Sequence, residues 1–296
     1  MRRRGRGGRW RAATLALVAA ALLAAALAAC ADVAPTPAPT PTPTPRPALV
    51  RLAGDTSMHP VALSLIAGQA AADPEGALYT LDESSSRDGL AEVREGRAEI
   101  GLVARDLDAA ALAGEGLLAV PIALDGLVVV VHQANPASAL SMDELRRLYA
   151  GRWYNWSAVG GLDQEVQLVA REEGSDARQV FDAKALQGEP LTRNSLALPT
   201  GEAVAEYVAT HPEAVGYVAL NGLRPGIKGL LLQGVPPDDA SIRGGAYPLT
   251  RPLYLVIRGD AGEAVKALVS YAVGAEGQRI IGGHHVPLYQ AGDQGL

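Results

Sequence analysis

The sequence predicts an α/β protein whose strands are mostly parallel and whose chain forms two lobes. Its 296 residues are 48% hydrophobic, which is enough to bury a core and to form about two domains of roughly 150 residues. From residue 48 onward, short apolar runs alternate with amphipathic stretches, and this alternation favours an α/β fold. Two long apolar runs, LDGLVVVVH and YPLTRPLYLVIRG, enclose a separate set of elements, which indicates the second lobe.

The elements before the first long run predict the first lobe. Strands are expected in ALVRLAG, GALYTLD and AEIGLVA, and helices in PVALSLIAGQAAA and RDGLAEVREG. The chain returns to this lobe through the second long run. We therefore expect lobe 1 to comprise residues 48–126 and 246–296, and lobe 2 to comprise residues 127–245.

The inserted segment predicts the second lobe. A capping box of Ser141 with Glu144 opens the helix SMDELRRLYAG, and Gly151 ends it. The strands VQLVA and AVGYVAL and the helix GEAVAEYVAT follow. Hinge crossings are expected near Gly126–Val130 and Leu253–Ile257, with a ligand cleft between the lobes.

The N-terminal 29 residues have the features of a secretory signal. A basic start precedes a short apolar run from Leu15 to Ala29, which is too short for a membrane span of about 20 residues and therefore favours a secretory signal. The run ends in LAAC, which resembles the lipobox of bacterial lipoproteins, and Cys30 is the chain's single cysteine. We expect Cys30 to be lipidated and to hold the protein at the outer face of the cell membrane.

The segment 30–47 is predicted to be a spacer, because its alternating Pro and Thr residues disfavour both helix and sheet. Loss of residues 1–29 would remove six arginines and no acidic residue, so the formal net charge of −6 would become −12. This charge, together with an aromatic content of 4%, argues against nucleic-acid binding. An anion would have to be bound by local donors against an unfavourable overall field.

Several segments, taken in order, resemble the PstS-like phosphate-binding branch of the bacterial solute-binding proteins. They are PIALDGLVVVVHQANPASALSMDELRRLYAGRWYNWSAVGG, VAREEGSDARQVFDAKAL, HPEAVGYVAL and YPLTRPLYLVIRGDAGEAVKALVSYAVGAEGQRIIGGHHVPL. The resemblance implies a type II periplasmic-binding fold of two α/β lobes. It also implies a monomer that is not an enzyme, needs no cofactor or metal, and delivers phosphate to an ABC permease.

The family holds its anion at three helix N-termini that carry hydroxyls, beside one arginine. By this resemblance, the first loop supplies Thr56 and Ser57, the second supplies Ser86, and the third supplies Arg171 and Ser175. Helix N-termini carry partial positive charge and unpaired N–H donors, so three converging ends suit a dianion.

Three positions depart from the family pattern in where they place acidic side chains. Asp176 stands where relatives usually have glycine, Asp55 where a small residue is common, and Ala104 where an acid usually accepts the proton of hydrogen phosphate. One hypothesis is that Asp176, or failing that Asp55 or Asp88, has taken over this acceptor role. The rival hypothesis is that these acids close the site to anions.

Other functions remain open at this stage. Ser, Thr and Asp before helices are often ordinary N-caps. A sensor or adhesion lipoprotein could keep the fold with altered or lost anion binding. A hydrolase is disfavoured, because the sequence contains neither a Gly-x-Ser-x-Gly elbow, nor His-Glu-x-x-His, nor a phosphate loop.

Overall fold

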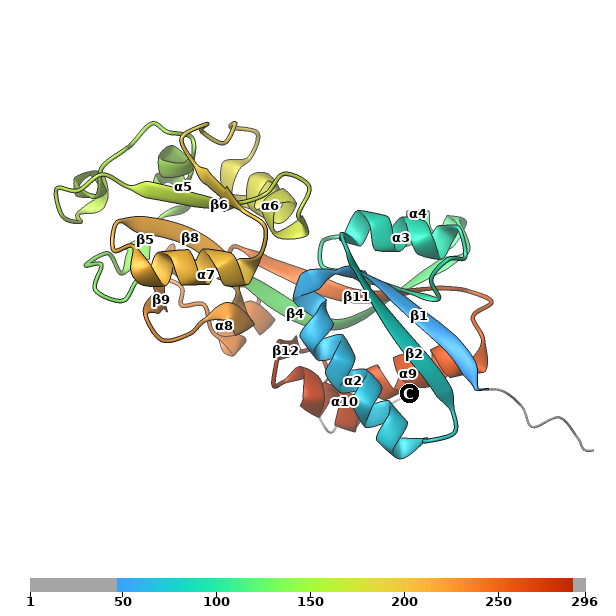
Figure 1. Cartoon of the computed structure of the whole chain (residues 1–296). Coiled ribbons are helices and arrows are strands. Elements are labelled where there is room, and N and C mark those ends of the chain that lie inside the picture. Colours follow the sequence, from blue (N-terminus) through green and yellow to red (C-terminus); the bar gives the residue numbers. More distant parts are fainter. Residues whose placement is uncertain (1–46, 290–296) are drawn as a thin grey trace, which may run out of the picture. The chain divides into compact units, whose positions relative to one another are not determined.

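The computed structural model describes residues 47–289 (Figure 1), which belong to one compact unit. The predicted signal peptide, the lipidation at Cys30 and nearly all of the predicted spacer lie outside the described residues. Within residues 47–289, none of the helices combines the length and the apolar character needed to cross a bilayer.

A ten-stranded sheet runs through the molecule in the order β2-β1-β3-β11-β4-β8-β6-β7, and β12 and β9 also pair with β4. Its strands are β1 (Ala48–Asp55), β2 (Ala77–Ser84), β3 (Ile100–Val103), β4 (Leu117–His132), β6 (Gln167–Arg171), β7 (Leu196–Leu198), β8 (Ala214–Ala219), β9 (Ile227–Gly229), β11 (Thr250–Arg258) and β12 (Val286–Pro287). A separate pair consists of β5 (Ala139–Leu140) and β10 (Leu231–Leu232).

The strand β4 is shared by two sections of this sheet. Its residues 117–126 pair antiparallel with β11, and its residues 127–131 pair antiparallel with β8. On one side, β1 is parallel to β2 and β3. On the other, β6 is parallel to β7 and β8. We call the part around β1, β2, β3 and β11 lobe 1, and the part around β6, β7 and β8 lobe 2.

Helices cover both faces of each section (Figure 1). In lobe 1 they are η1 (Thr56–Met58), α2 (His59–Ala72), α3 (Ser86–Arg94), α4 (Ala109–Gly114), α9 (Glu263–Val273) and α10 (Ala275–Ile281). In lobe 2 they are α5 (Met142–Tyr149), η2 (Trp156–Val159), α6 (Asp176–Phe181), the π-helical turn η3 (Asp182–Leu186), α7 (Gly201–Thr210), η4 (Leu220–Gly222) and α8 (Asp239–Arg243).

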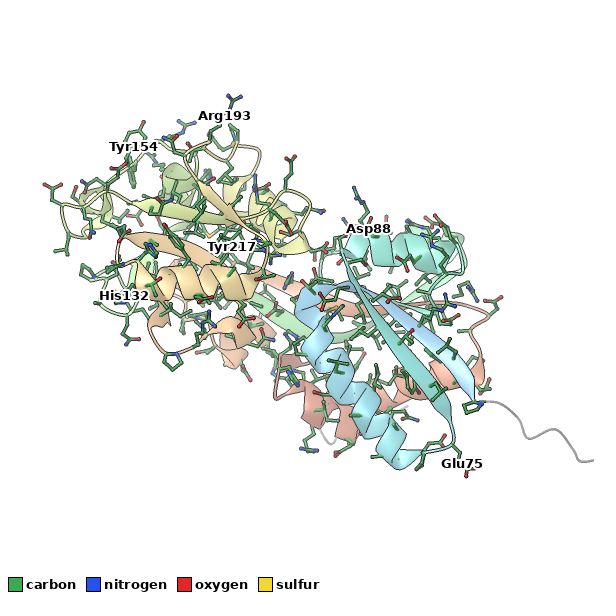
Figure 2. All side chains as sticks on the ribbon, viewed as in Figure 1. Glu75, Asp88, His132, Tyr154, Arg193 and Tyr217 are labelled. Carbon is green, nitrogen blue, oxygen red and sulfur yellow. The ribbon has the colours of Figure 1, made fainter. Side chains whose placement is uncertain are left out.

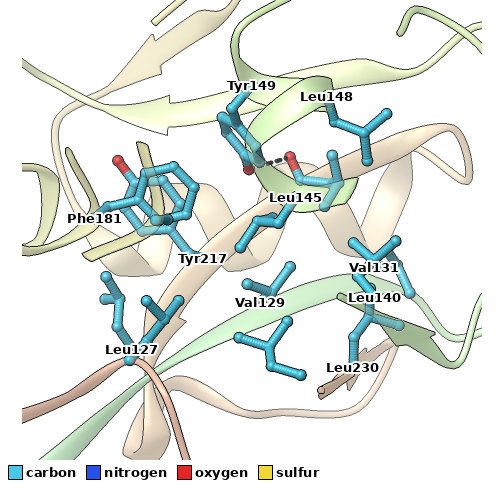
Figure 3. Close-up of a cluster of buried hydrophobic side chains, with 14 of the residues drawn as sticks. Leu127, Val129, Val131, Leu140, Leu145, Leu148, Tyr149, Phe181, Tyr217 and Leu230 are labelled. Carbon is cyan, nitrogen blue, oxygen red and sulfur yellow. Dashed lines mark hydrogen bonds between the residues drawn. The ribbon is translucent and has the colours of Figure 1, made fainter. Parts of the chain in front are cut away.

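Buried apolar side chains form separate clusters in the two lobes. The strands of lobe 1 pack against α2, α9 and α10 on one face and against α3 and α4 on the other. In lobe 2, the face of the sheet that carries α5 and α6 contains Tyr149, Phe181 and Tyr217 (Figure 3). The rings of Phe181 and Tyr217 are stacked, with centroids 4.2 Å apart, an arrangement that adds to the stabilisation from burial alone.

Local predictions for lobe 2 agree with the structure. The capping box of Ser141 and Glu144 is formed at the start of α5, and Gly151 has a left-handed φ of 70° just after that helix. The predicted helix GEAVAEYVAT is α7.

The second crossing was placed wrongly. Leu253–Ile257 pair with strands of lobe 1 along β11, so these residues lie inside that sheet. The backbone N–H of Leu127 donates to the carbonyl of Leu249 at 2.8 Å, and Leu249 packs in the lobe 2 core. The chain therefore passes between the lobes just before Thr250. An apolar run predicts a strand but does not reveal where the neighbours of that strand change.

Candidate functional site

A cleft of about 590 Å³ is lined by residues of both lobes. Lobe 1 contributes the loop after β1, the start of α2 and Arg251, while lobe 2 contributes the end of β6, the start of α7 and η4. Its lining residues include Asp55, Thr56, Ser57, Pro60, Glu83, Arg171, Ala177, Thr200, Gly201, Glu202, Tyr217, Asn221, Arg224, Arg251 and His284.

The loop after β1 brings a carboxylate and a hydroxyl to the cleft. Asp55 caps the short helix η1, because Oδ1 accepts from the backbone N–H of Ser57 at 2.9 Å. The hydroxyl of Ser57 also donates to this carboxylate. Thr56 is exposed beside it. Thr56 and Ser57 thus lie on the cleft, although Asp55 already engages both donors of Ser57.

Arg171 reaches the cleft from the end of β6. Its side chain is mostly buried, and the residue is 8% exposed. Nη2 donates to the carbonyl of Pro199 at 2.7 Å, and the backbone N–H donates to the hydroxyl of Tyr217 at 3.0 Å. Among the described residues, Nε has no hydrogen-bond partner. Burial lowers the pKa of Arg171 from its usual value, but a guanidinium remains protonated at neutral pH.

A second arginine, Arg251, was not singled out from the sequence. It is 1% exposed and pairs with Asp125 at 2.8 Å. Its Nη2 also donates to the hydroxyl of Ser57 at 2.9 Å. Burial alone would raise the pKa of Asp125, but the adjacent Arg251 guanidinium lowers it to about 2. The pair therefore stays ionised and positions Ser57 from beneath the cleft.

Asp125 also links the two lobes. It lies on β4 just before the crossing, and its Oδ1 accepts from the backbone N–H of Leu220 in lobe 2 at 3.2 Å. The quoted run LDGLVVVVH contains Asp125 and YPLTRPLY contains Arg251. A charged residue inside each of two apolar strands was a signal that could have revealed this buried pair, because buried charges are normally paired.

The N-terminus of α3 is positioned by close packing against β1. A Cβ at Gly89 would lie 2.4 Å from the carbonyl oxygen of Ala53, so only glycine lets the helix approach this closely. Ser86 is the first residue of α3, at the helix start where it was predicted, and Ser85 is the N-cap, whose hydroxyl accepts from the backbone N–H of Asp88 at 3.1 Å. The hydroxyl of Ser86 accepts from the backbone N–H of Ala104.

Asp176 lies directly against this helix start. Its Oδ2 accepts from the backbone N–H of Ser86 at 2.6 Å, and its side chain is 0% exposed. Arg105 is the nearest cation, with Nε 3.9 Å from Oδ1. Burial and then the adjacent Asp55 carboxylate raise the pKa of Asp176 to about 7. Its charge therefore changes near neutral pH.

Two further polar contacts bridge the lobes beside the contact between Asp176 and Ser86. Arg105 Nη1 donates to Gln179 Oε1 at 3.1 Å, and Lys184 Nζ lies 3.2 Å from Asp106 Oδ2. Both join the loop after β3 to the segment of α6 and η3. The lobes thus meet along the α3 and α6 side.

The predicted site residues separate into two groups. Thr56, Ser57 and Arg171 line the cleft. Ser86, Ser175 and Asp176 are not among the described residues that line it. Ser175 acts as the N-cap of α6, with its hydroxyl accepting from the backbone N–H of Arg178. The half-buried Asp88 accepts from the hydroxyl of Ser85 and lies near the start of α3 (Figure 2).

A resident metal was not predicted, and residues 47–289 contain no group of three or more His, Cys, Asp or Glu side chains arranged to hold one. The cleft is lined by guanidinium groups and hydroxyls together with the carboxylates of Asp55, Glu83 and Glu202. Such a set can bind an oxyanion and can accept a proton from it.

Two α/β lobes joined across a polar cleft define a two-lobed binding protein. The family model for the PBP superfamily domain matches residues 39–276, and the chain belongs to this superfamily. The predicted type II periplasmic-binding fold is thereby confirmed.

Relatives place the chain further within that superfamily. The phosphate-binding protein PstS of Bacillus subtilis (strain 168) is 27% identical over 240 residues, which cover 78% of this chain and 77% of that protein. A proposed phosphate ABC transporter substrate-binding protein from Clostridium perfringens, solved with bound phosphate, is 26% identical with a TM-score of 0.75. That match covers 82% of this chain and 100% of the other.

An ABC-type phosphate transport receptor from Vibrio cholerae is 23% identical with a TM-score of 0.69, and the match covers 79% of this chain and 98% of the other. This likeness supports the fold alone. The predicted resemblance to PstS-like proteins is confirmed, and the chain is a binding protein and not an enzyme.

Proposed function

We propose that the protein binds phosphate, or a closely related oxyanion, in the cleft and delivers it to an ABC permease. In this proposal it is a monomer, anchored by a lipid on Cys30 at the outer face of the cell membrane. The lobes close on the anion about the crossings at Gly126–Leu127 and Leu249–Thr250, and the permease recognises the closed state.

The single observation that carries the proposal is Arg171. Its guanidinium borders a cleft open to both lobes, and Nε has no hydrogen-bond partner within the described residues. A buried donor of this kind calls for an acceptor. An oxyanion would supply one, and charge-assisted bonds to arginine are among the strongest polar contacts in proteins.

The remaining groups give the site its selectivity. Thr56 would donate from the loop after β1, as would the hydroxyl of Ser57 once it exchanges Asp55 for the anion, and Arg251 would add positive charge at the cleft. Asp55 would accept the proton of hydrogen phosphate, which fully deprotonated sulfate cannot offer. Phosphate and arsenate are therefore favoured over sulfate.

Isothermal titration calorimetry on the full chain, purified in mild detergent, tests this function. Phosphate and arsenate are expected to release or absorb measurable heat at 1:1 stoichiometry, whereas sulfate and molybdate are not. Sulfate binding as tight as phosphate binding would contradict the role of Asp55. If none of the four anions gave measurable heat, the proposed function would be contradicted.

One observation favours the alternative of a sensor or adhesion lipoprotein with altered or lost anion binding. The Asp176 carboxylate already occupies the α3 N-terminus, where the family resemblance places an anion contact. The same calorimetry separates the two functions, because the alternative expects no oxyanion binding by the unmodified chain.

The proposed lipid anchor on Cys30 can be tested separately from anion binding. Changing Cys30→Ala removes the sole thiol available for lipidation, so the protein is expected either to leave the membrane fraction or to remain as an uncleaved precursor. Detergent partitioning and gel mobility measure both outcomes. Protein of mature size that still enters the detergent phase would contradict lipidation at Cys30.

A further inference from the structure

The N-terminus of α3 already holds an anionic group that belongs to the chain itself. Helix α3 has nine residues, and its first N–H groups lack partners within the helix. The N–H of Ser86 donates to Asp176 Oδ2 at 2.6 Å, across 90 positions of sequence and from one lobe to the other. A carboxylate at a helix N-terminus is bound by the same forces that bind an external oxyanion.

The carboxylate is otherwise poorly compensated. In the described part of the chain, Asp176 Oδ1 has no hydrogen-bond partner, and neither has Arg105 Nε, which lies 3.9 Å away. The other charged groups that act on Asp176 are Asp55, which disfavours its ionised form, and Arg251. A buried, unpaired oxygen that competes with a neighbouring carboxylate is held weakly and can be replaced.

We propose that Asp176 is an internal carboxylate ligand of the anion site, and that an incoming oxyanion must displace it to reach the N–H of Ser86. This inference rests on the proposed function. The cleft is lined by Asp55, Ser57, Arg171 and Arg251 but not by Asp176, which contacts the start of α3. Displacement would exchange a contact within the chain for a contact with the solute.

The same contact joins the two lobes. Asp176 bridges lobe 2 to lobe 1 at the position where a bound oxyanion would make that bridge, beside the contact between Arg105 and Gln179. Asp176 therefore weakens solute binding in two ways: it occupies a donor, and it places a negative charge near the solute.

The rival role predicts the opposite sign. If Asp176 stayed in place and accepted the proton of hydrogen phosphate, removing its charge would weaken phosphate binding. If it is an occupant of the site, removing its charge strengthens binding, since the competing anion is lost.

Asp176→Asn distinguishes these roles, because asparagine keeps the shape and can still accept from Ser86 but carries no charge. The control is Glu173→Gln, which removes one charge from the exposed part of the same turn. Phosphate and sulfate affinities are measured by calorimetry on the full chain at pH 8. Asp176→Asn is expected to tighten phosphate binding about tenfold or more, which corresponds to removing roughly 1.4 kcal/mol of competition, while Glu173→Gln leaves it unchanged.

A second measurement uses the titration of Asp176. At pH 6 the unmodified chain has a largely neutral Asp176, so the affinity ratio between Asp176→Asn and the unmodified chain should shrink. The ionisation of phosphate itself affects both chains alike. Asp176→Gly serves as a second variant if the asparagine form does not fold.

The outcomes separate this inference from the proposed function. Phosphate binding by the unmodified chain that is unchanged or weaker in Asp176→Asn would overturn the inference and leave the function standing. Binding by Asp176→Asn alone would support the inference and contradict phosphate binding by the unmodified chain. The absence of binding by all variants would overturn both.

Discussion

Replacing Arg171 with alanine is expected to remove most of the phosphate affinity. The guanidinium borders the cleft, and charge-assisted bonds from arginine to an anion are among the strongest polar contacts in proteins. Removing one partner of a buried charge pair typically costs about 2 to 5 kcal/mol, which corresponds to roughly 30-fold to several thousand-fold weaker binding. Calorimetry measures the loss of phosphate affinity. Arg171→Ala is introduced into the unmodified chain, or into the Asp176→Asn chain if only that chain binds phosphate.

Arg193→Ala is the matched control for this substitution. Arg193 is an exposed arginine of lobe 2 that lies away from lobe 1 (Figure 2), so it changes the net charge equally without altering the cleft. The phosphate affinity of the Arg193→Ala chain should stay within a factor of two of that of the parent chain. The same small effect for Arg171→Ala would show that the anion binds elsewhere.

Replacing Asp125 with asparagine should destabilise the fold strongly. Asparagine keeps the shape of Asp125 but leaves Arg251 as an uncompensated buried charge, since both residues are essentially inaccessible to solvent. Breaking one partner of a buried ion pair typically costs about 3 to 5 kcal/mol. Denaturant unfolding followed by circular dichroism measures the difference.

The loss of stability caused by Asp125→Asn should be smaller at low pH than at neutral pH. The pKa of Asp125 is lowered in the folded state to about 2, so its stabilising contribution is present above the unfolded pKa near 4 and is lost as pH falls toward 2. The difference in the free energy of unfolding between the two chains should narrow as the pH falls below 4. Glu276→Gln, at an exposed pair with Arg279, is the control and should change stability little. An equally small change for Asp125→Asn would contradict a role for the pair in stability.

Much of the fold follows from local sequence signals. Alternating strands and helices, the capping box at Ser141 and Glu144, and the helix of residues 201–210 are all set by residues close together in the chain. The second crossing was misplaced because β11 is apolar along its whole length, and the change of neighbours depends on pairing with β3 and β4. No local pattern near Leu253 records that pairing.

The site was harder to predict because its contacts join distant parts of the chain. Thr56, Ser57 and Arg171 were found through the family resemblance. The positions of Arg251 and Asp125 depend on two strands that meet only in the folded sheet. The contact of Asp176 with Ser86 spans the two lobes, so the sequence could indicate an unusual acid near a helix start but not what it contacts.

The position of β11 also determines the order in which the protein can be completed. This strand lies between β3 and β4, yet it is synthesised after all of lobe 2. A chain emerging N-terminus first therefore presents β3 and β4 with unpaired edges until residue 258 is available, and such edges invite pairing with other chains. Lobe 2 is contiguous in sequence and can form earlier. Residues 250–258 thus decide whether the sheet of lobe 1 is completed or keeps open edges that can pair with other chains.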